Sequence, residues 1–195
     1  MGRAPASPHP PDASLARALA IPGWMREAEL RWLAEHARPA RVIVEIGSFL
    51  GRSTRALGDH TAGVVYAIDF WNGGVGDAGS FDLTWADVQR EFTRHLEDLI
   101  ERGTVMPLPH TAATALDDLR ALGVRQADLV FIDGDHHYPA VCRDIRTARA
   151  LLARGGILSG HDYGQPWLPD VKRAVDELVG AVQLCDSIWW TEVWR

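Results

Sequence analysis

Short β-branched runs that alternate with helical segments constrain the fold of this chain more than any other feature. The runs predict five buried strands, at 42–46, 64–68, 104–108, 128–132 and 157–159. A segment with helical spacing follows each predicted strand, at 53–57, 85–102, 111–122, 140–153 and 169–179, and Gly155-Gly156 is expected at the end of the fourth helix. Strands and helices in this order form a parallel sheet with helices on both faces.

Two further strands are predicted at 182–185 and 188–194, and only Asp186 and Ser187 separate them. A two-residue connection is typical of a tight hairpin, so the last strand must run antiparallel to its neighbour. The sequence therefore predicts an α/β protein. Its core is expected to be a Rossmann-like, doubly wound, seven-stranded mixed sheet with the last strand antiparallel and helices on both faces.

Three segments are expected along the chain. Residues 1–13 hold four prolines and are expected to be a disordered N-terminal tail. Residues 14–38 are expected to form an N-terminal helical cap, with helices at 14–20 and 24–37. Residues 39–195 are expected to form the domain that carries the sheet, because 195 residues fit one domain of ordinary size.

Charge and composition exclude several classes of partner. The net charge is −6, Lys172 is the only lysine, and no block of basic residues occurs, so no nucleic-acid partner is predicted. No apolar run approaches the roughly 18 to 20 residues that cross a bilayer. The first residues contain no apolar signal region. We therefore expect a cytoplasmic protein that acts on a small molecule and has no membrane partner.

Cysteines and tryptophans are expected to serve packing. Cys142 and Cys185 form no CxxC pair that would indicate a zinc site, and both are expected to be small buried side chains. Trp189, Trp190 and Trp194 lie in the last predicted strand. They are expected to pack against helices of the sheet or against a second subunit in a homodimer.

Polar residues gather where the predicted strands end. Glu45 and Gly47 lie at the end of the first strand, and Asp69 follows the second. The sequence Asp-Gly-Asp-His follows the fourth strand at 133–136, and His-Asp-Tyr follows the fifth at 161–163. Ligands of doubly wound sheets bind outside the carboxyl ends of the strands. These residues therefore predict a ligand site at that edge.

The first loop favours a cationic ligand over a dinucleotide. Its sequence, E-I-G-S-F-L-G-R-S-T at 45–54, contains Gly47 and Gly51 but lacks the G-x-G-x-x-G fingerprint. The carboxylate of Glu45 would repel a pyrophosphate but suits an ammonium or sulfonium group. Asp69 ends the next strand, at the place where a carboxylate accepts ribose hydroxyls.

Together with the later motifs, this loop resembles the class I S-adenosylmethionine-dependent methyltransferases. Within that group it is similar to the small-molecule O-methyltransferase branch. The shared motifs are E-I-G-S-x-x-G-R-S-T at 45–54, I-D at 68–69, F-I-D-G-D-H-x-Y at 131–138 and G-G-x-x-x-x-H-D-Y at 155–163. The resemblance covers about residues 40–180 and implies that the sheet is a methyltransferase domain.

The resemblance implies S-adenosylmethionine as the cofactor and methyl transfer to a small molecule. The leading acceptor is a hydroxyl on a sugar or on a polyketide-like product. The first loop would hold the methionine part, Asp69 the ribose and Phe70 the adenine, whose edge would meet Thr111. The implied cofactor-binding residues are Glu45, Gly47, Ser48, Gly51, Ser53, Asp69, Phe70, Thr111 and Asp133.

A divalent metal is a further expectation at the same edge. Asp133 and Asp162 follow strands expected to be neighbours, and two carboxylates can share Mg²⁺. The resemblance to metal-dependent O-methyltransferases of catechols and antibiotic sugars implies that Asp133, His161 and Asp162 are the metal ligands. Because His161 stands where those enzymes carry a carboxylate, the site would favour Mn²⁺, Fe²⁺ or Zn²⁺, or would hold no metal.

His136 is the expected general base, next to Asp133 as the second catalytic residue. Sugar O-methyltransferases of this type use a histidine at that position, and an unperturbed histidine has a suitable pKa. The alternative is that His136 only shapes its loop by a hydrogen bond. His137 is expected to be its exposed neighbour.

Other interpretations stay open. The fold could host a nicotinamide-dependent oxidoreductase, although the incomplete glycine fingerprint, Glu45 and the terminal hairpin count against it. A methyltransferase-fold protein with a non-methylating activity and a non-catalytic binding subunit are further alternatives. The glycine-rich segment 71–81 could be a mobile lid or a passive surface loop. Trp167 is a candidate wall of the substrate pocket.

Overall fold

The computed structural model describes residues 13–71 and 83–193. Three predictions fall outside these residues: the tail at 1–13 except Ala13, the loop at 71–81 except Trp71, and the packing of Trp194. Within the described parts of the chain, no helix combines the length and apolar character needed to cross a membrane.

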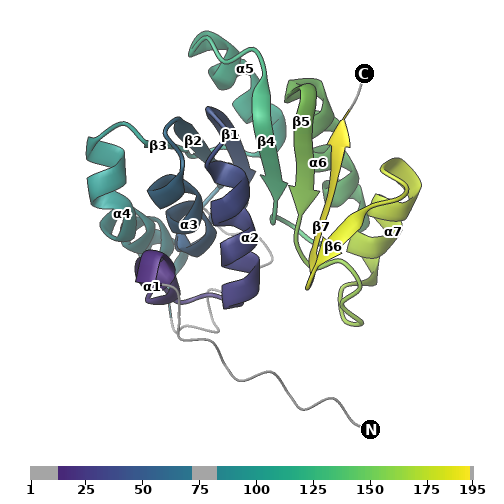
Figure 1. Cartoon of the computed structure of the whole chain (residues 1–195), viewed down its shortest axis with the longest axis horizontal. Coiled ribbons are helices and arrows are strands. Elements are labelled where there is room, and N and C mark those ends of the chain that lie inside the picture. The colour runs from purple at the N-terminus through teal and green to yellow at the C-terminus, as the bar shows by residue number, and fades with distance from the viewer. Residues whose placement is uncertain (1–12, 72–82, 194–195) are drawn as a thin grey trace, which may run out of the picture.

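The described residues form one seven-stranded sheet with the order β3-β2-β1-β4-β5-β7-β6 (Figure 1). Its strands are β1 Val42–Ile46, β2 Val64–Ile68, β3 Val105–Leu108, β4 Ala127–Ile132, β5 Leu152–Gly160, β6 Gln183–Cys185 and β7 Ile188–Val193. Strands β1 to β5 run parallel, and β7 runs antiparallel to β5 and β6. The predicted mixed, doubly wound sheet is confirmed.

Helices cover both faces of this sheet, as predicted. They are the 3₁₀ turn η1 Ala13–Leu15, α1 Ala16–Leu19, α2 Glu27–Ala37, α3 Arg52–His60, α4 Trp85–Glu101, α5 Ala112–Ala121, α6 Tyr138–Leu151 and α7 Pro169–Leu178. Helices α1 to α4 share one hydrophobic cluster with the sheet, and α5 to α7 share another.

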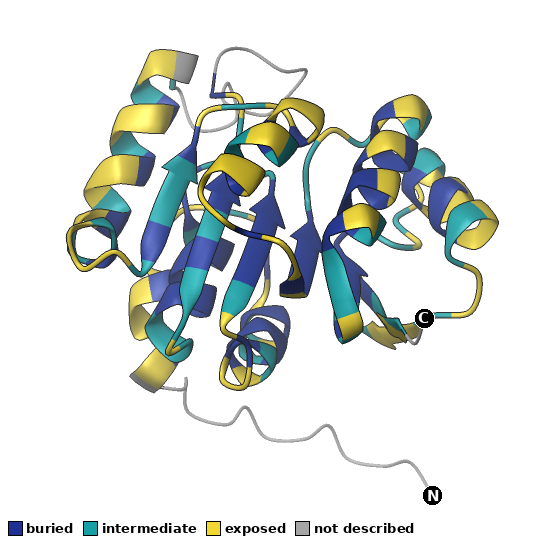
Figure 2. Cartoon of the chain, turned by 90° about the horizontal axis from the view of Figure 1, so that it is seen from above, coloured by how far each residue is buried: buried dark blue, intermediate teal, exposed yellow. Residues whose placement is uncertain are grey.

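Alternation along each strand separates the two clusters. In β1, Ile43 packs in the cluster with α1 to α4, whereas Val44 packs in the cluster with α5 to α7. Figure 2 shows the buried strands between helices whose outward faces are exposed. Because side chains alternate between faces, Glu45 lies on the same face as Ile43, where an apolar residue would be ordinary.

Several predicted boundaries were wrong. The helix predicted at 24–37 begins only at Glu27, because Arg26 is extended and its backbone N–H donates to the Glu29 side chain in a capping box. The helix predicted at 140–153 ends at Leu151, since Leu152 already pairs with Ala127 in the sheet. Strand β5 is therefore longer than the predicted 157–159 and includes the glycine pair assigned to the helix end.

The terminal hairpin and its tryptophans follow the prediction. Asp186 turns the chain with φ 51°. Trp189 is buried, and Trp190 lies 5.9 Å from the ring of Trp32 on α2. Both indoles thus pack within the described molecule.

The two cysteines differ in burial. Cys142 is buried in α6, as predicted, but Cys185 is only partly buried. The prediction for Cys185 was wrong because β6 is the last strand in the sheet order and is covered on fewer sides.

Candidate active site

Strand register brings the predicted site residues to one edge of the sheet. Ile46 pairs with Ile68 and Ile132, and Ile132 pairs with Gly160. The residues that directly follow these strand ends are Gly47, Asp69, Asp133 and His161. Backbone hydrogen bonds continue the ladder beyond the strands, from Gly47 to Ile68 at 2.8 Å, from Asp133 to Ile46 at 2.7 Å and from His161 to Ile132 at 3.0 Å.

Glu45 is a fully buried carboxylate beneath the first loop. Its Oε2 accepts a hydrogen bond from Ser48 Oγ at 2.7 Å and another from the Thr54 hydroxyl. Oε1 has no hydrogen-bond partner among the described residues. Burial raises the pKa of Glu45 to about 7, and the hydroxyls of Ser53, Thr54 and Ser48 offset this only in part. A buried acceptor without a partner is costly unless a ligand completes it.

Gly47 lets the first loop touch the end of β4. Its φ is +90°, and a Cβ atom there would lie 2.1 Å from the carbonyl oxygen of Asp133. No side chain fits at that distance. Gly51, with φ 89°, then turns the chain into α3.

Asp69 ties the first two loops together. Its Oδ2 accepts from Phe49 N at 2.8 Å, and its Oδ1 accepts from Trp71 N at 2.9 Å. Burial raises the pKa of Asp69, although these backbone bonds counteract it. Each carboxylate oxygen can accept a second hydrogen bond, so capacity for a ligand hydroxyl is left.

A cavity of about 300 Å³ opens at this edge between the ends of β1, β2 and β4. Five of the predicted cofactor residues line it, namely Gly47, Asp69, Phe70, Thr111 and Asp133. Phe70 is 50% exposed. Thr111 is the N-cap of α5. The predicted adenine and ribose contacts thus border one space.

A second cavity of about 540 Å³ lies beside the first. The N-terminal part of α2, the first loop and the segment after β5 form its walls, and the predicted residues Ser48, Ser53 and Trp167 line it. Asp133 and His136 border both cavities. A molecule in one cavity would therefore meet a molecule in the other beside these two side chains.

His136 joins two carboxylates at this junction. Its Nε2 lies 2.9 Å from Asp162 Oδ2 and 3.8 Å from Asp133 Oδ1. Although buried, Nε2 makes no well-aligned hydrogen bond with a described residue. Burial alone would lower the pKa of His136, but the two carboxylates outweigh it and raise the pKa to about 10. One potential ligand atom from each of the three residues lies within 4.8 Å of the others.

His161 faces the same carboxylates from the other side. Its Nδ1 lies 3.3 Å from Asp162 Oδ1 and 3.6 Å from Asp133 Oδ1. Its Nε2 lies 3.1 Å from Glu29 Oε1 and 3.0 Å from Ser187 Oγ. Burial opposes the imidazolium, yet these neighbours raise the pKa of His161 to about 11. His161 thus lies beside the two predicted carboxylate ligands, whereas the three side chains whose potential ligand atoms all lie within 4.8 Å of one another are Asp133, His136 and Asp162.

Glu29 is a site residue that the sequence did not reveal. It lies in the first turn of α2 and is 1% exposed. Burial would raise its pKa, but His161, Ser187 and Arg26 lower the pKa to about 2. Its place three residues after the N-cap indicates a capping role, and nothing in the sequence connects it with residues far along the chain.

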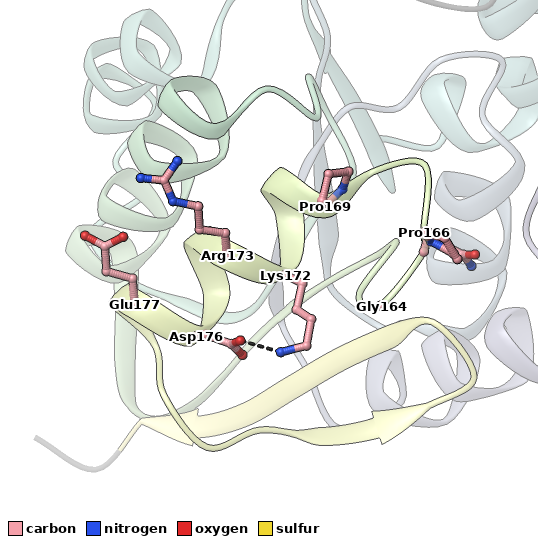
Figure 3. A pocket seen from close by; sticks show the side chains of 8 residues that line it. Gly164, Pro166, Pro169, Lys172, Arg173, Asp176 and Glu177 are labelled. Carbon is pink, nitrogen blue, oxygen red and sulfur yellow. Dashed lines mark hydrogen bonds and ion pairs between the residues drawn. The ribbon is translucent and has the colours of Figure 1, made fainter.

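The other candidates near the site take minor places. His137 is exposed and pairs with Asp135 at 2.6 Å, as expected for the neighbour of His136. A third concavity, of about 630 Å³, lies along α7 and the segment before it. There Lys172 pairs with Asp176, and Arg173 and Glu177 border the same hollow (Figure 3). This hollow contains none of the strand-end residues.

Sequence comparison assigns the family. Residues 44–163, more than half of the chain, match the family model described as a methyltransferase domain. The match includes Glu45, Asp69, Asp133 and Asp162. This chain belongs to that family.

Solved structures share the fold of this methyltransferase domain. An O-methyltransferase from Bacillus cereus, in complex with SAH, is 16% identical with a TM-score of 0.68, covering 95% of this chain and 92% of its own. CalS11, a TDP-rhamnose 3'-O-methyltransferase of calicheamicin biosynthesis, is 14% identical with a TM-score of 0.62 and coverages of 84% and 76%. TomG from Streptomyces achromogenes, an O-methyltransferase of tomaymycin synthesis in complex with SAM, is 18% identical with a TM-score of 0.63 and coverages of 94% and 91%.

A curated relative matches only a short segment of this chain. The uncharacterized protein R132 of Acanthamoeba polyphaga mimivirus is 37% identical over 57 residues. That segment spans 29% of this chain and 26% of the viral protein.

Proposed function

We propose that this methyltransferase domain transfers the methyl group of S-adenosylmethionine to a hydroxyl of a small-molecule acceptor. The observation that carries the proposal is the meeting of two cavities at Asp133 and His136. One cavity has the acidic strand ends that suit the cofactor, and the other leads to a histidine that could take the acceptor proton. Relatives of the same fold solved with SAM or SAH support the choice of cofactor.

The cofactor contacts follow from the strand ends. Bound S-adenosylmethionine supplies a methyl group made electrophilic by its sulfonium. Glu45 is fully buried and lines neither cavity, and its unpartnered Oε1 would accept from the ammonium of the methionine part when the cofactor is bound. Asp69 accepts from the ribose hydroxyls with its remaining lone pairs. Phe70 and Thr111 border the adenine, and Gly47 lets the cofactor approach the backbone closely.

The acceptor occupies the larger cavity. Trp167 lines the larger cavity only, whereas Trp24 and Phe49, whose rings are 5.4 Å apart, line both cavities. Aromatic walls of this kind suit a sugar ring or a flat natural product. The sugar and antibiotic O-methyltransferases among the structural relatives support that acceptor class.

The acidic edge fits a divalent cation. Asp133 and Asp162 offer oxygen ligands, and the unaligned Nε2 of His136 is a buried nitrogen beside them. A bound cation supplies Lewis acidity that lowers the pKa of an acceptor hydroxyl. The residues that would hold it are Asp133, Asp162 and His161, which leaves Nε2 of His136 available for the acceptor proton.

His136 is the proposed base. Asp133 and Asp162 hold its ring at the junction of the two cavities. With its pKa raised to about 10, His136 keeps its proton at neutral pH. The pKa of His136 falls toward its ordinary value when another positive charge neutralises the carboxylates, and Nε2 can then accept the hydroxyl proton.

Methyl transfer is tested by turnover on an acceptor panel. Radiolabelled S-adenosylmethionine is incubated with the protein and with nucleotide sugars, catechols and polyketide aglycones, in the presence of Mg²⁺ or Mn²⁺. Label in an acceptor supports the proposal. Cofactor binding without label transfer to any hydroxyl would favour a non-methylating activity on this fold.

A further inference from the structure

A buried hydrogen-bond chain links α2 to the acidic edge. Ser187 N donates to Glu29 Oε1 at 3.2 Å, and Ser187 Oγ donates to the same oxygen at 2.5 Å. His161 Nε2 lies 3.0 Å from Ser187 Oγ and 3.1 Å from Glu29 Oε1. All three side chains are at least nine-tenths buried, with exposures of 1%, 5% and 8% for Glu29, Ser187 and His161.

The donors and acceptors of this chain fix the His161 ring. Ser187 has one hydroxyl proton, and it goes to Glu29. The bond between Ser187 and His161 therefore requires Nε2–H as the donor, and the Glu29 carboxylate can only accept. Nδ1 is left to face Asp162 Oδ1 at 3.3 Å and Asp133 Oδ1 at 3.6 Å.

We propose that Glu29 is a positioning residue that orients His161 so that Nδ1 joins Asp133 and Asp162 in a nitrogen-and-oxygen set for a transition-metal ion. The inference rests on the proposed metal-assisted function and deepens it. A metal-ligating histidine almost always donates its other N–H to a carboxylate or carbonyl, which fixes the ring and raises its basicity. Glu29 stands in that place.

The types of ligand atom in this set, one imidazole nitrogen and carboxylate oxygens, indicate which metal ions it would bind. An imidazole beside two carboxylates favours Mn²⁺, Fe²⁺ or Zn²⁺, whereas Mg²⁺ prefers oxygen ligands. Glu29 would matter for metals that use the nitrogen of His161 and have little effect on Mg²⁺ bound through carboxylates and water. A merely structural role for Glu29 predicts equal losses for both ions.

Titration of the full chain with Mn²⁺ and, separately, with Mg²⁺ tests the inference by calorimetry, without cofactor or acceptor. Glu29→Gln is expected to weaken Mn²⁺ binding by about tenfold or more and to change Mg²⁺ binding by less than about twofold. Glu35→Gln, the same change at an exposed position of α2, is the matched control and should leave both affinities unchanged. Circular dichroism checks that each variant is folded.

Several results would overturn the inference. They are a wild type that binds no Mn²⁺, unchanged Mn²⁺ binding in folded Glu29→Gln, and equal losses for Mn²⁺ and Mg²⁺. If Glu29→Gln does not fold, Ser187→Ala carries the test, because it removes the hydroxyl that bridges Glu29 and His161. Ser187→Ala should also weaken Mn²⁺ binding more than Mg²⁺ binding, by a smaller factor than Glu29→Gln. Equal effects on the two ions contradict the inference.

A double-mutant cycle asks whether Glu29 acts through His161. The double variant Glu29→Gln/His161→Ala should lose about as much Mn²⁺ affinity as His161→Ala alone. A loss equal to the sum of the losses in the two single variants contradicts the inference. SAH binding is measured on the same samples. If wild type binds SAH but Glu29→Gln does not weaken Mn²⁺ binding more than Mg²⁺ binding, this inference alone is contradicted. If wild type binds no SAH, the proposed function is contradicted.

Discussion

Two carboxylates near the cofactor cavity, Glu45 and Asp144, are buried with raised pKa values, but they differ in their surroundings. Glu45 has hydroxyl donors at one oxygen, and its other oxygen has no hydrogen-bond partner among the described residues. Asp144 on α6 has Arg143 Nε at 3.8 Å as its ion-pair neighbour. Burial raises the pKa of Asp144 to about 6. Asp144 lines the smaller cavity, whereas Glu45 lies beneath the first loop and lines neither cavity, so at the residue scale the two carboxylates differ in access as well as in partners.

Asp144→Asn should stabilise the protein at neutral pH. The folded pKa of about 6 exceeds the ordinary value of 3.8, so the folded state keeps a proton that the unfolded chain loses. Wild-type stability therefore falls as pH rises from about 4 to 6, by about 3 kcal/mol. Urea denaturation should find the variant more stable by about that amount at pH 7.5 and equal to wild type near pH 4. Asp117→Asn, at an exposed position, is the control, and a variant less stable at both pH values contradicts the account.

His136→Ala should lower turnover by about 10²- to 10⁴-fold. Its side chain borders both cavities, but its ion-pair partners are Asp133 and Asp162 and not Glu45 or Asp69, so SAH affinity should stay within about twofold. Methyl-transfer rates and calorimetry measure the two effects. His137→Ala is the matched control, since that ring is exposed and pairs with Asp135. Equal turnover in His136→Ala would leave His136 only a loop-shaping role.

At the scale of elements, β-strand ends were predictable and helix–strand junctions were less so. The predicted strand at 42–46 has the observed bounds, because Gly47 follows it directly and turns the chain with a positive φ. At 152–156 the sequence has helical residues followed by Gly155-Gly156, which suggests a helix end. Pairing of Leu152 with Ala127 and of Gly156 with Val193 makes this segment a strand instead. Tertiary pairing overrides local preference there.

Gly47→Ala and Gly164→Ala separate backbone strain from close approach. Both glycines have positive φ, at 90° and 81°. A Cβ at Gly47 meets the Asp133 carbonyl at 2.1 Å, whereas a Cβ at Gly164 meets nothing within 4 Å. Urea denaturation should show a loss of about 1 kcal/mol for Gly164→Ala and a loss of more than about 2 kcal/mol for Gly47→Ala. Equal losses would mean that the loop is not held against β4 as described.

At the scale of the whole molecule, residues 22–26 and Glu29 of the N-terminal region line the larger cavity. Arg52 of α3 donates to the carbonyls of Leu19, Ile21 and Met25 and so fixes the segment that borders the larger cavity. Glu29 bonds to Ser187, 158 residues away in the chain. Sequence spacing could predict the cofactor edge because strand order collects it, but it gives no sign of contacts that only the packed fold creates.

The central claim is that the acidic strand ends hold S-adenosylmethionine, and calorimetric titration with SAH tests it most directly. Wild type should bind SAH and not NAD⁺. Glu45→Gln should bind SAH at least about tenfold more weakly because a charge-assisted bond is lost, while Glu97→Gln on the exposed face of α4 should match wild type. Binding by wild type should also strengthen as pH rises through about 7, since Glu45 must lose its proton to accept the ammonium. If wild type binds NAD⁺ or fails to bind SAH, the assignment of the cofactor is contradicted.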